Sequence, residues 1–320
     1  MDFIEIEYGN YFSSESNRIF ASYQPLESTE FEQLKFPPDG KVVWAKNDGK
    51  VLYKDEKYYG IYHDGLVKGI YDAKKNNVIN LIRDPSRYFN ISIGVIDYLF
   101  SKALFQQNIF RIHAAGVSKG KNVLLICGTK GVGKTTLLMK FLQNGYNFVA
   151  DDSIYIQFIN NELICYPFPK TIKITARDLI KFPKLYKNLN FSKTTDSTGI
   201  QKAIIPPQNN YFPIETHTST ISQIIIPSIS RTTECKNDVI QPSDPSSQFC
   251  VVDVLKRNFS FDLLKPSFRG EGLLNIDYIE NPEITAKQDE LCKQTLQKYE
   301  LKFFKIGLDI EEIDIKGYFS

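Results

Sequence analysis

The chain has 320 residues, of which 42% are hydrophobic and 24% are charged, a composition typical of a globular protein and not of a disordered or fibrous one. Lysine and arginine number 39 against 37 acidic residues, and the resulting net charge of +2 is too small to indicate nucleic acid or a membrane surface as a partner. The cysteines are scattered without a C-x-x-C pair, which predicts reduced thiols and neither disulfides nor a zinc site. The acidic start predicts that there is no signal peptide, and no apolar run approaches the ~20 residues of a membrane span. The protein is therefore expected to be cytoplasmic.

The first part of the sequence, residues 41–83, consists of short β-runs separated by polar turns. Asp48-Gly49 and Asp64-Gly65 each stand between two such runs, and dipeptides of this type favour tight hairpins. An antiparallel meander is therefore predicted here. A helix is expected after it, from about Ile91 to Phe105, because apolar side chains recur there at helical spacing.

The pattern changes at Asp84-Pro85-Ser86, where we place a boundary between a β-rich N-terminal domain, residues 1–85, and a catalytic domain, residues 86–320. In the second domain, apolar strands alternate with a glycine loop and helices, which is typical of an α/β fold. Strands are expected at residues 110–117, 123–127, 151–158, 163–167 and 171–175, and helices at residues 135–144, 246–258 and 285–299. The polar stretch 188–220 is predicted to be a loop and is a candidate for a mobile lid.

The clearest motif lies between the strand that ends at Cys127 and the helix that follows it. Residues 128–135 fit the pattern G-x-x-x-x-G-K-[ST] at every position, in the strand–loop–helix context that phosphate binding requires. The glycines let backbone N–H groups face a β-phosphate, the helix start adds a positive dipole, and Lys134 adds a full charge. Thr135 would supply a hydroxyl to Mg²⁺. The nucleotide site is predicted at Gly128, Thr129, Lys130, Gly131, Val132, Gly133, Lys134, Thr135 and Thr136. A glycine turn without a ligand is the alternative, but it leaves the adjacent Lys and Thr unexplained.

Two adjacent carboxylates, Asp151 and Asp152, follow the apolar run that ends at Ala150. If this run returns as a strand beside the strand that precedes the glycine loop, adjacent side chains point to opposite sides. One carboxylate then reaches a metal ion while the other faces the attacking group, and a simple turn into Ser153 is the alternative. Asp253 also ends an apolar run and is a rival metal ligand, but the S-D-P-S sequence before it predicts a helix, with Asp253 solvated.

Three segments together resemble the HPr kinase family: R-I-H-A-A-G-V at residues 111–117, the glycine loop, and V-A-D-D at residues 149–152. The resemblance is tight over residues 110–156. It extends more loosely through Y-P-F-P-K at residues 166–170 and towards the C-terminus, where the chain is similar to the shorter HPr-kinase-like enzymes of peptide-maturation pathways, including lasso-peptide pathways.

The resemblance implies a phosphoenolpyruvate-carboxykinase-type P-loop domain, which is an α/β fold, beside the smaller β-rich domain. It places Thr135 and Asp151 about the metal, Asp152 as acceptor of the substrate proton, and His113 near the acceptor hydroxyl. A lone histidine on an apolar strand is more often a structural residue, and the spacing to the glycine loop favours the catalytic role. Lys170 follows a proline, and contact with phosphate or peptide is weighed equally against a solvated position.

One signature of the HPr kinases, E-I-R-G-L-G after the Asp pair, is absent, and the nearest string, R-G-E-G-L at residues 269–273, lies far beyond it. HPr is therefore not the expected substrate. The sequence predicts an ATP- and Mg²⁺-dependent kinase of a Ser or Thr hydroxyl on a peptide, and the resemblance implies that this peptide is a ribosomally made precursor. A kinase of a small hydroxylated metabolite and a nucleotide-driven switch stay open as alternatives, although a guanine-reading N-K-x-D string is absent. The sequence leaves homo-oligomer formation open.

Overall fold

The computed structural model describes residues 22–26, 35–46, 49–62, 67–72, 77–82, 101, 104–105, 107–187, 192–195, 199–207, 211–229, 252–256, 258, 282–299, 301–306 and 315. The fold of these residues is mixed α/β, and the chain divides into two compact units. The described residues up to Phe110 belong to the first unit and Arg111–Asn258 to the second, while the long helix α8 (Pro282–Lys298) contributes to both, with the change after Thr285. The predicted boundary at residues 84–86 and most of the helix predicted at residues 91–105 lie outside the described residues. Among the described residues, no helix combines the length and apolar composition that a membrane crossing requires.

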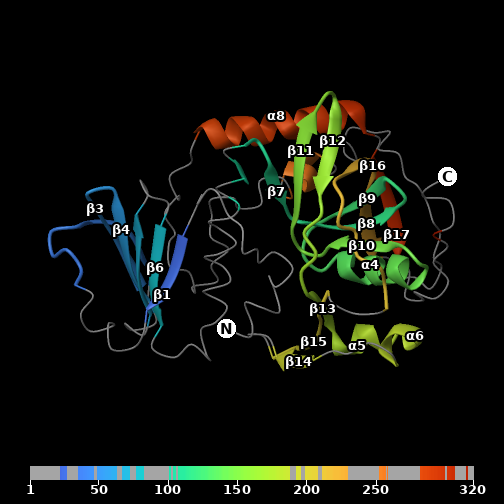
Figure 1. The fold of residues 1–320 in the computed structure, drawn as a ribbon, viewed down its shortest axis with the longest axis horizontal. Helices are drawn as coiled ribbons and strands as arrows, with labels where there is room; N and C mark the ends of the chain where they lie inside the picture. Colours follow the sequence, from blue (N-terminus) through green and yellow to red (C-terminus); the bar gives the residue numbers. More distant parts are fainter. Residues whose placement is uncertain are drawn as a thin grey trace. The chain divides into compact units, whose positions relative to one another are not determined.

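A six-stranded sheet forms the first unit (Figure 1). The predicted antiparallel meander is confirmed as β2 (Lys41–Lys46), β3 (Gly49–Lys54), β4 (Lys57–Tyr62), β5 (Val67–Asp72) and β6 (Asn77–Ile82). Asp55 and Glu56 form a tight turn between β3 and β4 that the sequence analysis does not identify. Both have positive φ, 51° and 59°, as in the type I′ turn whose twist matches the paired strands. The strand β1 (Ser22–Leu26) also has no predicted counterpart, and it pairs parallel with β6.

An eight-stranded sheet dominates the second unit, in the order β10-β8-β9-β16-β12-β11-β7, with β17 paired to β16 outside this order. Its strands are β7 (Phe110–Ile112), β8 (Ala114–Lys119), β9 (Asn122–Cys127), β10 (Asn147–Ala150), β11 (Ile154–Ile159), β12 (Glu162–Tyr166), β16 (Ser219–Ile229) and β17 (Leu301–Ile306). Both parallel and antiparallel pairs occur: β9 and β17 run parallel to β16, while β8 and β12 pair antiparallel with their neighbours.

This sheet is curled, and His113 lies where its two ends meet. The strands β7 and β8 stand near opposite ends of the strand order, yet His113 is the sole residue between them in the chain. The sheet must therefore roll up until its ends approach each other. The single strand predicted at residues 110–117 is wrong in this respect, because the chain bends at His113 and leaves it at the seam.

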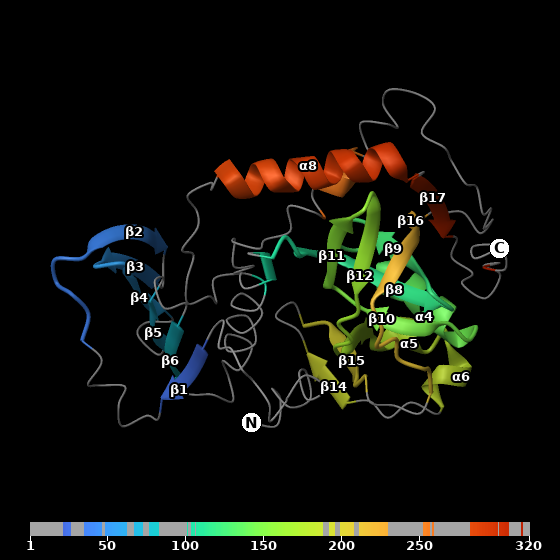
Figure 2. The same cartoon turned by 45° about the horizontal axis from the view of Figure 1, so that its top comes forward.

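The helix α4 (Lys134–Gln143) packs against β8 and β9 and holds the glycine loop in place (Figure 2). Its buried face includes Leu137, Leu138 and Phe141, which are fully inaccessible to solvent and belong to the main core of this unit. Each such side chain contributes about 1.5–3 kcal/mol of hydrophobic stabilisation. Since β9 and α4 are both anchored in this core, the loop between them has fixed ends.

A smaller antiparallel sheet, in the order β13-β15-β14, corrects the prediction that residues 188–220 are a loop. It consists of β13 (Ile172–Thr175), β14 (Ser192–Thr195) and β15 (Gln201–Ile205), and the short helices α5 (Ala176–Leu179) and α6 (Pro183–Tyr186) follow β13. In β15, Ala203 and Ile205 are buried, while Ile204 between them is less so. This alternation is the period of a strand, and the surrounding Ser, Thr and Asn conceal it in the sequence.

Candidate functional site

The glycine loop connects β9 to α4 with a backbone that glycine alone adopts without strain. Gly128 has φ 153°, and a Cβ atom there would lie 2.6 Å from Cγ2 of Val132. Gly133, the N-cap of α4, has φ 96°. The helix has neither a side-chain cap nor an acidic residue in its first turn. Its first N–H groups are therefore available to an anion, which the helix dipole attracts.

The ammonium group of Lys134 is held against this loop. Its Nζ donates to the carbonyl oxygens of Gly128 at 2.8 Å and Thr129 at 3.2 Å, and it lies 2.9 Å from Nε2 of His113. These three contacts match the three hydrogens of an ammonium group. Lys134 is 8% exposed, and burial lowers its pKa, while the carboxylates of Asp152 and Asp151 oppose that shift. A buried cation is thus stationed beside the start of α4.

The imidazole of His113 connects Lys134 to the Asp pair. Its Nδ1 lies 2.9 Å from the backbone oxygen of Asp152 and 3.2 Å from the Oδ1 of the same residue. A carbonyl oxygen accepts only, so Nδ1 carries the hydrogen, and the Nε2 lone pair faces Lys134. Burial lowers the pKa of His113 despite the nearby Asp152 carboxylate. These contacts assign the neutral tautomer of His113 with the proton on Nδ1.

The two aspartates lie in a tight turn and not on a strand. The strand β10 ends at Ala150, and the N–H of Ser153 donates to the oxygen of Asp151 at 2.8 Å, which closes a three-residue turn with Asp152 at its centre. Asp152 has φ 66°, a conformation that costs a non-glycine residue about 1–3 kcal/mol. The Asp151 side chain is buried, whereas that of Asp152 is 74% exposed. The carboxylates thus point in different directions because of the turn.

Two details of the predicted strand arrangement are wrong here. The strand expected at residues 151–158 begins at Ile154, and β10 pairs with β8, so that β8 separates it from β9. The hydroxyl of Thr135 nevertheless reaches Asp151, with Oγ1 at 3.2 Å from Oδ1 and 3.3 Å from Oδ2. The first turn of α4 spans the distance, because Thr135 is its second residue.

The environment of Asp151 fits a divalent cation. Burial, reinforced by the charge of Asp152, raises the pKa of Asp151 from 3.8 to about 7. A cation between Asp151 and Thr135 would offset the cost of a buried negative charge. A carboxylate, a hydroxyl and ligand phosphate oxygens form the hard oxygen set that Mg²⁺ prefers.

Asp151 should make the stability of the metal-free protein depend on pH. Between about pH 4 and pH 7 the folded protein retains a proton on Asp151 that the unfolded chain has released, so its contribution to stability is lost as pH rises. We expect the unfolding midpoint of the wild type, measured in a chelator, to fall over this range relative to that of Asp151→Asn. Added Mg²⁺ should reduce the difference. A constant gap between the two proteins would show that Asp151 is ionised throughout.

Two supporting contacts have no signal in the sequence. Arg111 donates from Nε and Nη2 to Oγ of Ser153, at 3.0 Å and 2.6 Å, and so ties β7 to the end of the Asp turn. Asn258 contacts both Gly128 and His113. Motif spacing could not have identified Arg111 or Asn258, because their partners are distant from them in the chain. Asp253 lies in the helical residues 252–256, as predicted.

Lys170 is buried, which contradicts the alternative of a solvated lysine. It is 8% exposed, and its Nζ lies 4.9 Å from the centre of the Phe168 ring, within the range of a cation–π interaction. The N–H of Phe168 donates to the oxygen of Val149 at 3.2 Å, which ties this segment to β10. Contact of Lys170 with phosphate or peptide stays a prediction.

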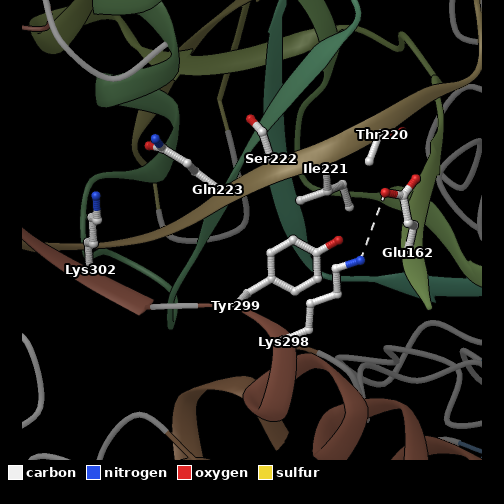
Figure 3. A pocket seen from close by; sticks show the side chains of 8 residues that line it. All are labelled: Glu162, Thr220, Ile221, Ser222, Gln223, Lys298, Tyr299 and Lys302. Atoms are coloured by element: carbon white, nitrogen blue, oxygen red, sulfur yellow. Dashed lines mark ion pairs between the residues drawn. The ribbon is translucent and has the colours of Figure 1, made fainter. Parts of the chain in front are cut away.

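A pocket of about 430 Å³ lies where β16 changes partners (Figure 3). One edge of β16 pairs with β12 at Ser219 and Thr220 and with β17 from Ile224 onwards, and the pocket opens at the fork between them. The ammonium of Lys298 lies 3.9 Å from Glu162 (Figure 3). The hydroxyl of Tyr299 accepts from the N–H of Leu163 at 3.0 Å. None of the residues that line this pocket belongs to the glycine loop or the Asp turn.

Comparison with known proteins gives a distant likeness among solved structures. No family model matches the chain, and no curated protein matches its sequence. Among solved structures, the chain is similar to the Hpr(Ser) kinase/phosphatase from Coxiella burnetii, at 18% identity over 42% of this chain and 73% of that one, with a TM-score of 0.23. A TM-score at this level does not establish a shared fold, so the geometry of the site itself supports the function that follows.

Proposed function

We propose that this chain is an ATP- and Mg²⁺-dependent kinase that transfers the γ-phosphoryl group to a hydroxyl. The observation that supports this is the meeting, around one uncapped helix start, of the groups that phosphoryl transfer uses. These are a glycine loop with free N–H groups, the ammonium of Lys134, the hydroxyl–carboxylate pair of Thr135 and Asp151, and the exposed carboxylate of Asp152.

Each group has a distinct task in binding. The N–H groups of residues 129–136 and the ammonium of Lys134 would face the β- and γ-phosphates, whose negative charge also meets the positive end of the α4 dipole. Thr135 and Asp151 would hold Mg²⁺, which would offset the negative charge of the phosphates when bound. Lys134 has to exchange one of its present acceptors for a phosphate oxygen. The exchange keeps its hydrogen-bond count and gives it an ionic partner.

Asp152 is the group best placed to receive the proton. As the acceptor oxygen bonds to the γ-phosphorus, the bond from that phosphorus to the oxygen of ADP breaks, and the hydroxyl proton passes to the carboxylate. Nδ1 of His113 lies 3.2 Å from Oδ1 of Asp152, so the imidazole restricts the orientation of this carboxylate. Its exposure leaves room for an acceptor, whereas Asp151 is buried.

The resemblance to HPr-kinase-like enzymes supports the finer part of the proposal. On that basis the catalytic unit has the phosphoenolpyruvate-carboxykinase-type P-loop fold, and the acceptor is a Ser or Thr of a ribosomally made precursor peptide. A hydroxylated metabolite is the second candidate, because an exposed Asp152 accommodates a small acceptor equally well.

The test is product analysis. The protein is incubated with Mg²⁺ and γ-labelled ATP, together with either the peptides encoded beside its gene or a panel of hydroxylated metabolites, and the products are identified by mass spectrometry. A phosphopeptide would support the proposal in full, and a phosphorylated metabolite would support kinase chemistry with the other acceptor. Release of free phosphate alone would indicate a nucleotide-driven switch, and no nucleotide binding at all would contradict the proposal.

A further inference from the structure

Asn258 joins three segments of the second unit through one buried residue. Its Oδ1 accepts from the N–H of Gly128 at 3.1 Å, and its Nδ2 donates to the oxygen of Val254 at 2.6 Å. Its backbone oxygen accepts from the N–H of His113 at 3.0 Å. The residue is 1% exposed. A helical segment that includes residues 252–256 is thereby bonded to both the glycine loop and the seam of the curled sheet.

The side-chain orientation of Asn258 is determined by its partners. Val254 offers a carbonyl oxygen, which only accepts, and Gly128 offers an N–H, which only donates. The amide of Asn258 supplies the acceptor for Gly128 and the donor for Val254. If the amide were rotated by 180°, its NH₂ group would face the N–H of Gly128 and its oxygen would face the oxygen of Val254. Leucine or threonine, although similar in size or polarity, offers no such pair. The position therefore selects for an amide.

The two groups that Asn258 holds are also linked to each other. Gly128 begins the glycine loop, and its carbonyl oxygen accepts from Nζ of Lys134, which in turn lies 2.9 Å from Nε2 of His113. Asn258 bonds to the N–H of Gly128 on one side and of His113 on the other. The pairing of Ala114 with Cys127 between β8 and β9 already brings the loop and the imidazole close together. Asn258 adds a direct link between them, and it contacts neither phosphate nor metal in the proposed site.

We infer that Asn258 is a positioning residue, which sets the start of the glycine loop relative to His113 and so places Lys134 for phosphate. Its value for catalysis rests on the proposed kinase function. Its effect on the position of the loop is independent of that function. The experiment therefore measures the position of the loop and the affinity for nucleotide separately.

The loop is observed through the amide of Gly128. Cys127-Gly128 is the sole Cys-Gly step in the sequence, so labelling cysteine carbonyls with ¹³C and glycine nitrogens with ¹⁵N isolates one amide signal in the full-length protein. In Asn258→Ala the signal should shift upfield, and its hydrogen exchange should accelerate by at least about tenfold, because the acceptor is gone. Asn258→Asp retains an oxygen acceptor and should restore the protection.

Thr295→Val provides the matched control. Thr295 is fully buried on α8, and its Oγ1 donates to the oxygen of Leu291 at 2.7 Å, so the substitution also removes one buried hydrogen bond. It should lower the unfolding midpoint and leave the Gly128 signal unchanged. An unchanged Gly128 signal in Asn258→Ala, or an equal change in Thr295→Val, would overturn the inference.

The second measurement is the affinity for a non-hydrolysable ATP analogue with Mg²⁺. Asn258→Ala should weaken binding by about tenfold, the effect of misplacing one or two hydrogen bonds, while Thr295→Val should bind as the wild type does. Equal affinity in wild type and Asn258→Ala would overturn the positioning role. A wild type that binds no nucleotide would instead refute the proposed function, and the Gly128 signal would still decide whether Asn258 places the loop.

Discussion

Lys134→Ala is expected to reduce phosphoryl transfer by about 10²–10³-fold, the usual loss when one preorganised charge is removed from a transition state. The ammonium is already held beside the helix start by Gly128, Thr129 and His113, so it only has to exchange one of these acceptors for a phosphate oxygen. The fold should survive, because the buried apolar side chains of α4 are unchanged. Turnover with the acceptor found by product analysis gives the rate, and circular dichroism checks the fold.

Lys130→Ala is the matched control for this substitution. Lys130 belongs to the same loop and carries the same charge, but it is exposed where Lys134 is buried. Its replacement should change the rate only a few-fold, since exposed charges are screened by solvent. Equal losses in the two variants would show that the loop needs positive charge in general and would remove the specific role of Lys134.

Asp152→Asn should lower the rate by about 10²–10⁴-fold, the range for loss of a general base, while binding of ATP and Mg²⁺ persists. Asparagine tolerates positive φ, so the turn at Asp152, with φ 66°, is retained. Asp151→Asn should instead weaken Mg²⁺ binding, because it removes the buried carboxylate that faces Thr135. Isothermal titration with Mg²⁺ and the ATP analogue, beside single-turnover rates, separates the two effects. The reverse pattern would exchange the two assignments.

The sequence predicts those parts of the site that lie close together in the chain. The glycine loop can be recognised in the sequence because Gly128 and Gly133 have backbone conformations that strain other residues. Lys134 and Thr135 must also come directly after Gly133, at the start of the helix. The N-terminal meander is also local, since short polar stretches separate its strands in the sequence, but no dipeptide signal predicts the turn at Asp55 and Glu56. In these places the pattern and the structure depend on the same few neighbouring residues.

What the sequence does not predict is decided by tertiary contacts. The bond from Asn258 to Gly128 joins residues 130 positions apart, and that from Arg111 to Ser153 joins residues 42 positions apart. The bend at His113 follows from the curl of the whole sheet, which no local pattern encodes. The turn centred on Asp152 is also hidden, because an apolar run followed by two aspartates is compatible with a longer strand.

The seam at His113 also governs when in folding the site can form. Strands that close a curled sheet are expected to pair late in folding. Bringing distant segments together lowers the entropy of the chain before their contacts can stabilise the fold. The bond from Arg111 on β7 to Ser153 at the end of the Asp turn joins the two ends of the sheet on closure, because β7 and β10, the strand that leads into this turn, stand at opposite ends of the strand order. A nucleotide that binds only the assembled site would therefore draw the folding equilibrium towards the closed sheet by mass action. Ligand concentration in the cell would then set the lifetime of the closed sheet as well as the occupancy of the site.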